Sequence, residues 1–177
     1  MQVIALLRGV TPTGKNRIPK MAHLGDLLEN EGFRQVKTFG QSGNILLETN
    51  LAEIETAHKI KAVILEHSGA ELAVIIKTKE QLGVAIKENP FDGTYDLSRI
   101  QLVFTNNEID PVKVEKIKAI DFGEEIFDGG SECFYMYLPR TAAKKKLSNN
   151  FIEKQLSIVT TTRNLNVVKK LCALNDH

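Results

Sequence analysis

Val3-Ile4-Ala5-Leu6-Leu7-Arg8 is the stretch of the chain that decides the fold. Its first five residues are apolar without alternation, which predicts a short strand in the middle of a sheet. Pro19 suits the first turn of a helix, and apolar residues recur at helical spacing from there to a stop at Gly32. Further strands are predicted at 34–39, 44–48 and 71–77, with a second helix at 51–68. This order, βαββαβ, is that of the ferredoxin-like split βαβ unit.

The second half of the chain repeats the order with variations. A linking helix is predicted from Thr78 or Lys79 to Lys87, and a loop at 89–99 follows the stop at Asn89-Pro90. Strands are predicted at 100–104, 124–127 and 132–138, a turn at 128–130, helices at 110–120 and 149–156, and a short last strand at 157–159. Thr162 is predicted to cap a final helix. We therefore predict an α+β fold of two tandem ferredoxin-like halves with antiparallel sheets, residues 1–78 and 79–177, the second including the linking and C-terminal helices.

Composition argues against a membrane-spanning, secreted or cysteine-based redox protein. The chain has 177 residues, 42% of them hydrophobic, and no apolar run long enough to span a membrane. The N-terminus lacks a basic leader and a cleavage site, and Cys133 and Cys172 form no metal or redox motif. These features predict a cytoplasmic protein with free thiols.

Charge is spread unevenly along the chain. The net charge is +1, yet residues 139–170 hold eight Lys and Arg residues against one Glu. Such a basic segment favours an anionic partner, a nucleic acid or a phosphorylated small molecule. The alternative is that these lysines are merely solvated.

The first candidate site follows the first strand. Gly9, Gly14 and Lys15 nearly spell the phosphate-binding loop G-x-x-x-x-G-K-[ST]. Asn16 stands where a magnesium-binding Ser or Thr is required, and the predicted sheet is antiparallel, so a nucleotide-hydrolysing loop is not favoured. An anion site built from backbone N–H groups, Lys15 and Arg17 is more plausible. The alternative is a structural connector between strand and helix.

Gln41-Ser42-Gly43-Asn44 forms the second candidate, in a predicted hairpin turn. In a split βαβ sheet the strand at 44–48 runs antiparallel to the first strand, so its beginning lies beside the end of that strand. The turn should therefore lie next to Arg8 and Lys15. The candidate ligand-binding residues here are Arg8, Lys15, Asn16, Arg17, Gln41, Ser42 and Asn44. A purely structural turn is the alternative for Gln41 to Asn44.

The C-terminal part adds three candidates. Lys146 belongs to Lys146-Leu147-Ser148-Asn149, which precedes a predicted helix, and Arg163 and Asn164 end the run Thr160-Thr161-Thr162-Arg163-Asn164. If that run opens the last helix, Arg163 could grip an anion at the helix N-terminus. Simple capping by Thr162 is the alternative.

The remaining aromatic, cysteine, histidine and acidic residues favour structural roles over functional ones. Cys133, Tyr135 and Tyr137 share one face of a strand, where core packing is favoured over base stacking. The histidines have no metal-ligand spacing, and no carboxylate pair stands out. We therefore predict no metal site, and the sequence leaves the cofactor and any catalytic residues unknown.

These motifs resemble those of an uncharacterised bacterial family called domain of unknown function 1697. The matching stretches are 5–9, 14–16, 41–44, 89–91, 146–149 and 161–164, and the match departs at 11–13, where family members commonly carry Asn-Val-Gly. The resemblance implies the tandem α+β fold and supplies no activity, substrate or cofactor.

The sequence leaves three functional hypotheses. The first, slightly favoured, is an intracellular binder of an anionic ligand that contains phosphate or is a nucleic acid. The second is a small-molecule enzyme with a pocket between the two halves, lined by Arg8, Ser42, Asn44 and Arg163. The third is a self-associating interaction protein.

Overall fold

The computed structural model describes residues 1–11, 13–18 and 20–174. They form an α+β protein whose chain divides into two compact units, Met1–Lys79 and Glu80–Leu174. Pro12 and Pro19, to which the sequence assigned a loop and a first helical turn, lie outside the described residues.

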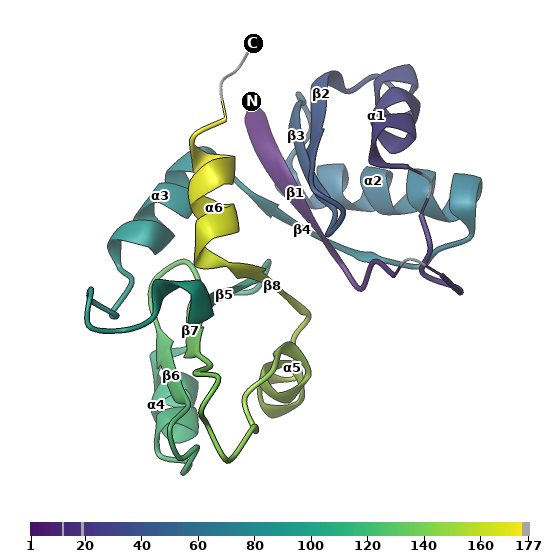
Figure 1. Ribbon diagram of the computed structural model, residues 1–177. Helices are drawn as coiled ribbons and strands as arrows, with labels where there is room; N and C mark the ends of the chain where they lie inside the picture. The colour runs from purple at the N-terminus through teal and green to yellow at the C-terminus, as the bar shows by residue number, and fades with distance from the viewer. Residues whose placement is uncertain (12, 19, 175–177) are drawn as a thin grey trace. The chain divides into compact units, whose positions relative to one another are not determined.

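The first unit is a four-stranded antiparallel sheet with two helices. Its elements are β1 (Gln2–Arg8), α1 (Met21–Asn30), β2 (Arg34–Phe39), β3 (Asn44–Glu48), α2 (Glu53–Ser68) and β4 (Ala73–Lys77). The strand order is β2-β3-β1-β4, which places the apolar β1 inside the sheet as its composition predicts. Figure 1 shows α1 and α2 against the same face of this sheet. Alternate residues of β1 (Val3, Ala5 and Leu7) face these helices in the core.

The second unit has a second four-stranded antiparallel sheet. Its elements are α3 (Lys79–Lys87), the 3₁₀ helix η1 (Leu97–Arg99), β5 (Ile100–Thr105), α4 (Pro111–Lys118), β6 (Ile126–Gly129), β7 (Phe134–Tyr137), α5 (Asn149–Leu156), β8 (Thr160–Asn164) and α6 (Leu165–Cys172). The strand order is β6-β7-β5-β8, the counterpart of the order in the first unit. A core between α4, α5 and one sheet face contains Val103, Ile117, Phe127 and Ile152.

Helices α3 and α6 adjoin each other in this unit. A Cβ atom built on Gly83 of α3 would lie 3.9 Å from Sγ of Cys172 in α6. The hydroxyl of the buried Tyr135, on β7, donates a 2.5 Å hydrogen bond to the carbonyl of Ala85 in α3. Burial raises the pKa of this phenol far above its usual range, so Tyr135 acts as a neutral packing residue.

Several local predictions are confirmed at the level of single residues. Asp110 caps α4, where its Oδ1 accepts from the Val112 N–H at 2.9 Å, and Pro111 occupies the first turn. Gly69 ends α2 in the left-handed conformation, with a φ of 72°. Both signals are local, since they depend on backbone groups within four residues.

The C-terminal prediction is wrong in register. The last strand is Thr160–Asn164 and not 157–159, and it pairs with β5 through partners such as Leu102 and Arg163. Thr162 therefore does not cap the final helix; Asn164 does, and its Oδ1 accepts from the Asn166 N–H at 2.9 Å. Three consecutive threonines are β-branched and favour an extended strand, which explains the shift.

The hairpin of β6 and β7 is also shifted in sequence relative to the prediction. The predicted turn at 128–130 is partly strand, because Asp128 and Gly129 belong to β6. The chain turns after Gly130, whose N–H donates to the Cys133 carbonyl at 2.9 Å. Among the described residues, no helix is both long and apolar enough to cross a bilayer.

Candidate functional site

The loop that follows β1 is closed by its own backbone. The Thr11 N–H donates to the Asn16 carbonyl and the Arg17 N–H donates to the Gly14 carbonyl, each at 3.2 Å. Gly9 and Gly14 have φ values of 82° and 85°, a conformation that favours glycine. Gly9 and Gly14, which resemble the glycines of a phosphate-binding loop, thus allow the chain to turn between β1 and α1. The sheet of this unit is antiparallel.

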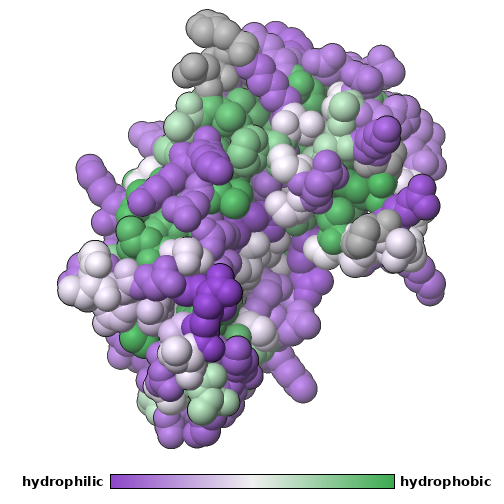
Figure 2. All heavy atoms as spheres, in the orientation of Figure 1, coloured by the Kyte–Doolittle hydropathy of each residue, from purple (hydrophilic) through white to green (hydrophobic). Residues whose placement is uncertain are grey.

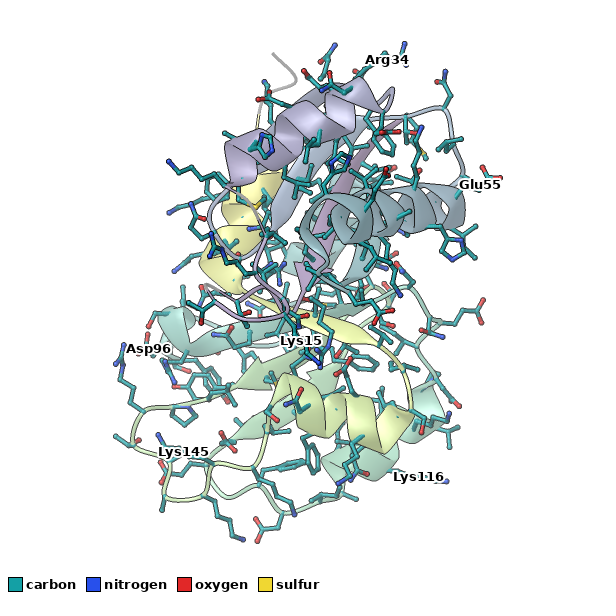
Figure 3. The ribbon with its side chains drawn as sticks, turned by 90° about the vertical axis from the view of Figure 1, so that its right-hand side faces the viewer. Lys15, Arg34, Glu55, Asp96, Lys116 and Lys145 are labelled. Atoms are coloured by element: carbon teal, nitrogen blue, oxygen red, sulfur yellow. The ribbon has the colours of Figure 1, made fainter. Side chains whose placement is uncertain are left out.

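Three basic side chains lie on the segment between β1 and α1, those of Lys15, Arg17 and Lys20. The side chains of Lys15 and Arg17 are exposed, and neither forms an ion pair with any part of the chain that the structure describes. Figure 3 shows Lys15 on the segment between β1 and α1. Arg8, at the end of β1, and Asn16 are half-buried. Lys15 and Arg17 are therefore accessible positive groups within the closed loop, and Lys20, directly before α1, is exposed as well.

The turn between β2 and β3 lies beside the end of β1. The Leu7 N–H donates to the Gly43 carbonyl at 2.8 Å, and Leu6 pairs with Asn44. A Cβ atom on Gly43 would lie 2.6 Å from Cβ of Leu7, so the turn packs directly on β1. The structure thus brings the two N-terminal clusters to one end of one sheet.

Asn44 holds this turn in place. Its side chain is 1% exposed, and its Nδ2 donates to the Phe39 carbonyl at 2.9 Å and to Oγ of Ser42 at 3.0 Å. Gln41 and Ser42 remain exposed at the tip. Asn44 is therefore a structural residue of the turn, while Gln41 and Ser42 are its accessible polar groups.

The basic segment around Lys146 forms contacts with residues of its own unit. The backbone N–H groups of Lys146 and Leu147 donate to one oxygen of the buried Glu125 carboxylate, at 2.6 and 2.9 Å. The Lys146 ammonium lies 5.9 Å from the ring centres of both Phe122 and Phe151. Glu125 is the anchor that sequence reasoning missed, because nothing in its sequence neighbourhood signals a contact with residues 21 positions away.

Lys144 and Ser148, which lie near Lys146 in the sequence, also have partners within the unit. Lys144 pairs with Asp121 at 3.4 Å. The hydrogen bond from the Gly123 N–H, and after it the charge of Lys144, lower the pKa of Asp121. Ser148 caps α5 by accepting from the Phe151 N–H at 3.1 Å. The motif Lys146-Leu147-Ser148-Asn149 thus has a structural account within its own unit.

Arg163 is 6% exposed and lies in β8, not at a helix N-terminus. Its Nη1 donates to Oγ1 of Thr161 at 2.7 Å and to the Thr162 carbonyl at 2.9 Å. Burial lowers the pKa of this guanidinium to about 10, so it is charged at neutral pH. The predicted position of Arg163 at the start of the last helix is therefore wrong, and its role in binding an anion stays a prediction.

Asn164 and Asn149 also have structural contacts. The Asn164 amide donates to the Ser98 carbonyl at 2.8 Å in addition to its capping bond. Oδ1 of Asn149 accepts from the hydroxyls of Thr160 and Thr162, each at 2.8 Å. Within the described ranges, no group of three or more His, Cys, Asp or Glu side chains is placed to hold a metal ion.

Comparison with known proteins identifies the family. Residues 1–135 match the family described as "Protein of unknown function (DUF1697)". The chain belongs to this family. The matched region contains the loop after β1 and the turn between β2 and β3, whereas Lys146, Arg163 and Asn164 lie beyond it.

A solved structure has the same fold. It is that of the conserved bacterial protein SP0830 from Streptococcus pneumoniae, which is 20% identical in sequence and superposes with a TM-score of 0.70. The comparison covers 97% of this chain and 96% of the other. No curated protein matches the chain. The family description names no ligand, so the function has to be argued from the geometry.

Proposed function

We propose that this protein binds a phosphate-containing anion at the loop–turn site, which we define as Lys15, Arg17, Gln41 and Ser42. The observation that carries the proposal is the pair of exposed cations, Lys15 and Arg17, on a loop closed by its own backbone hydrogen bonds. An ammonium group is a point-charge partner for phosphate, and a guanidinium binds phosphate oxygens in bidentate fashion.

The neighbouring turn supports this proposal. Because the Gly43 carbonyl accepts from β1 and Asn44 is buried, the polar tip at Gln41 and Ser42 is held on the sheet. A binding group that is already ordered loses less conformational entropy when a ligand arrives. The loop–turn site therefore combines charge with pre-organisation.

Pyrophosphate is a suitable first probe, and thermal unfolding is a direct measurement. At a concentration 100 times its Kd, a ligand that binds only the native state stabilises it by about 2.7 kcal/mol. For a protein of this size that shift corresponds to a rise in Tm of roughly 5–10 °C. We expect this rise for the wild type and its loss in the double variant Lys15→Ala/Arg17→Ala.

Lys145→Ala provides the matched control. Lys145 is exposed on the loop before α5, as Figure 3 shows, and removing it takes away one positive charge elsewhere on the chain. The control should keep the full rise in Tm. If the control lost as much of the rise in Tm as the double variant, the positive charge of the whole protein, and not the loop–turn site, would attract pyrophosphate.

We also propose that each compact unit is a ferredoxin-like domain with the boundary at 78/79. The strand orders β2-β3-β1-β4 and β6-β7-β5-β8, each with two helices inserted as βαββαβ, support this class. Amide exchange measured by NMR tests the boundary, because residues of one domain should share a common opening free energy.

A further inference from the structure

We infer that the ligand of the loop–turn site is a small phosphate monoester, recognised by its phosphate and not by a nucleobase or a nucleic-acid backbone. This inference rests on the proposed function, and it goes further by naming the class of ligand. Three features of the described residues support it: the charge of the loop–turn site, the aromatic residues of the first unit, and the contacts of the basic segment.

The charge of the site fits one monoester. A phosphate monoester carries about −1.5 to −2 charges at pH 7 and offers three acceptor oxygens. Lys15 and Arg17 together supply two positive charges, and the exposed Gln41 amide is neutral and both donates and accepts hydrogen bonds. Gln41 and Ser42 are the neutral polar groups of the site, and such groups suit the hydroxyls of a sugar phosphate.

The first unit offers little for a base to stack on. Residues 1–79 contain two aromatic side chains, Phe33 and Phe39. Phe33 is 4% exposed and lies beneath the Lys59 ammonium, 5.2 Å from it, and Phe39 is half-buried at the end of β2. The middle strand β1, from Val3 to Leu7, presents aliphatic side chains only. Single-strand binders use exposed aromatic faces, each contributing about 1–3 kcal/mol per base.

Several residues of the basic segment of the second unit lie beside carboxylates. Lys144 faces Asp121, and the backbone around Lys146 is bound to Glu125. The neighbouring Thr141 hydroxyl donates to Glu124 at 3.2 Å, so the segment lies along three carboxylates. Nucleic-acid phosphates bind to Lys and Arg side chains, and carboxylates beside these cations repel the phosphates. This segment therefore does not favour a polynucleotide.

Isothermal titration of the full chain tests the inference with four probes: ribose, ribose 5-phosphate, AMP and a 12-nucleotide oligo(dT). Ribose should not bind, and ribose 5-phosphate and AMP should bind with Kd values within about threefold of each other. The oligonucleotide should bind no more tightly than AMP, and its log K should fall with log salt with a slope of about −1.4, the value for two phosphate contacts on a single strand.

Variants locate the binding. Lys15→Ala and Arg17→Ala should each weaken ribose 5-phosphate at least about tenfold, while Lys145→Ala leaves it unchanged. Arg17→Lys should recover only part of the loss, because lysine lacks the bidentate fork. Unchanged thermal unfolding without ligand would show that each variant is folded.

The outcomes separate this inference from the proposed function. Failure of pyrophosphate, ribose 5-phosphate and AMP alike to bind would overturn both. Binding of AMP more than about tenfold tighter than ribose 5-phosphate, or a salt slope steeper than about −3 for the oligonucleotide, would overturn the inference and leave the proposed function standing.

Discussion

Asn44 and Gly43 illustrate how single residues set the geometry of the loop–turn site. The side-chain amide of Asn44 donates to the Phe39 carbonyl inside the turn. Gly43 allows the turn to approach β1 closely, since it has a φ of 89° and no side chain to meet Leu7. Both residues act on the backbone, so their role is to place the tip at Gln41 and Ser42.

Gly43→Ala should lower the free energy of unfolding by about 2–4 kcal/mol, because a left-handed φ and an overpacked contact with Leu7 both oppose the new Cβ. Gly93→Ala is the matched control. Gly93 is exposed and has nothing within 4 Å of an added Cβ, so its effect should stay within about 0.5 kcal/mol. Urea denaturation measures both, and equal effects would contradict the close packing of the turn on β1.

Arg163→Ala should lower the free energy of unfolding by about 1–3 kcal/mol, because Thr161 and the Thr162 carbonyl lose a buried donor. Pyrophosphate affinity should remain within about twofold of the wild type, since the Arg163 side chain is buried and donates hydrogen bonds within β8. Denaturation and calorimetry on the same samples distinguish the two roles. A large loss of affinity at unchanged stability would restore Arg163 as a ligand-binding residue.

At the scale of elements, β8 is bound to helix α5 as well as to its neighbouring strand β5. It is an edge strand in the order β6-β7-β5-β8, and Asn149 at the start of α5 accepts hydrogen bonds from two of its hydroxyls. The Glu153 carboxylate of the same helix accepts from the Thr160 N–H at 2.8 Å. Helix α5 therefore fixes the beginning of β8 through polar side chains as well as through its apolar face.

Asn149→Ala should lower stability by about 1–3 kcal/mol and speed amide exchange in Thr160–Asn164, because two hydroxyls lose their common acceptor. Asn166→Ala is the control, since Asn166 is exposed near the start of α6 and its side chain should matter by no more than about 0.5 kcal/mol. Hydrogen exchange resolved by residue would contradict this account if β8 kept wild-type protection in the Asn149 variant.

At the scale of the whole molecule, the surface of the chain is mainly polar. Figure 2 shows hydrophilic residues over most of the visible face, with hydrophobic residues gathered in smaller patches. β4 ends at Lys77 and α3 begins at Lys79, so Thr78 alone connects this strand to this helix. The exposed basic residues outside regular structure lie instead near Lys15 and near Lys145.

Trypsin should therefore cut the native chain first after Lys15, Arg17 or the lysines at 144–146, because exposed loops reach the protease more easily than helices. Pyrophosphate at ten times its Kd should slow the cuts after Lys15 and Arg17 by about tenfold and leave those at 144–146 unchanged. Intact-mass spectrometry over time follows each cut. First cleavage within α3 or α6 would show that these helices open more readily than the loops.

The sequence by itself determined the order of the elements, the α+β class, the cap of α4 and the end of α2. Apolar periodicity, the Asp110-Pro111 pair and Gly69 depend on interactions within a few residues, so they can be read without knowledge of distant partners. The placement of the turn at 41–44 beside β1 also followed from the sequence, because the order of antiparallel strands fixes which ends are neighbours.

Only the tertiary structure decided which candidate side chains are accessible. Arg163 became buried because β8 pairs with β5 in a register that the sequence did not reveal, and Lys146 is tied to Glu125 across 21 positions. Asn44 likewise turned inward, while Lys15 and Arg17 stayed exposed. Burial and long-range hydrogen bonding depend on which segments meet after folding, and a local pattern of residue types carries no direct record of those partners.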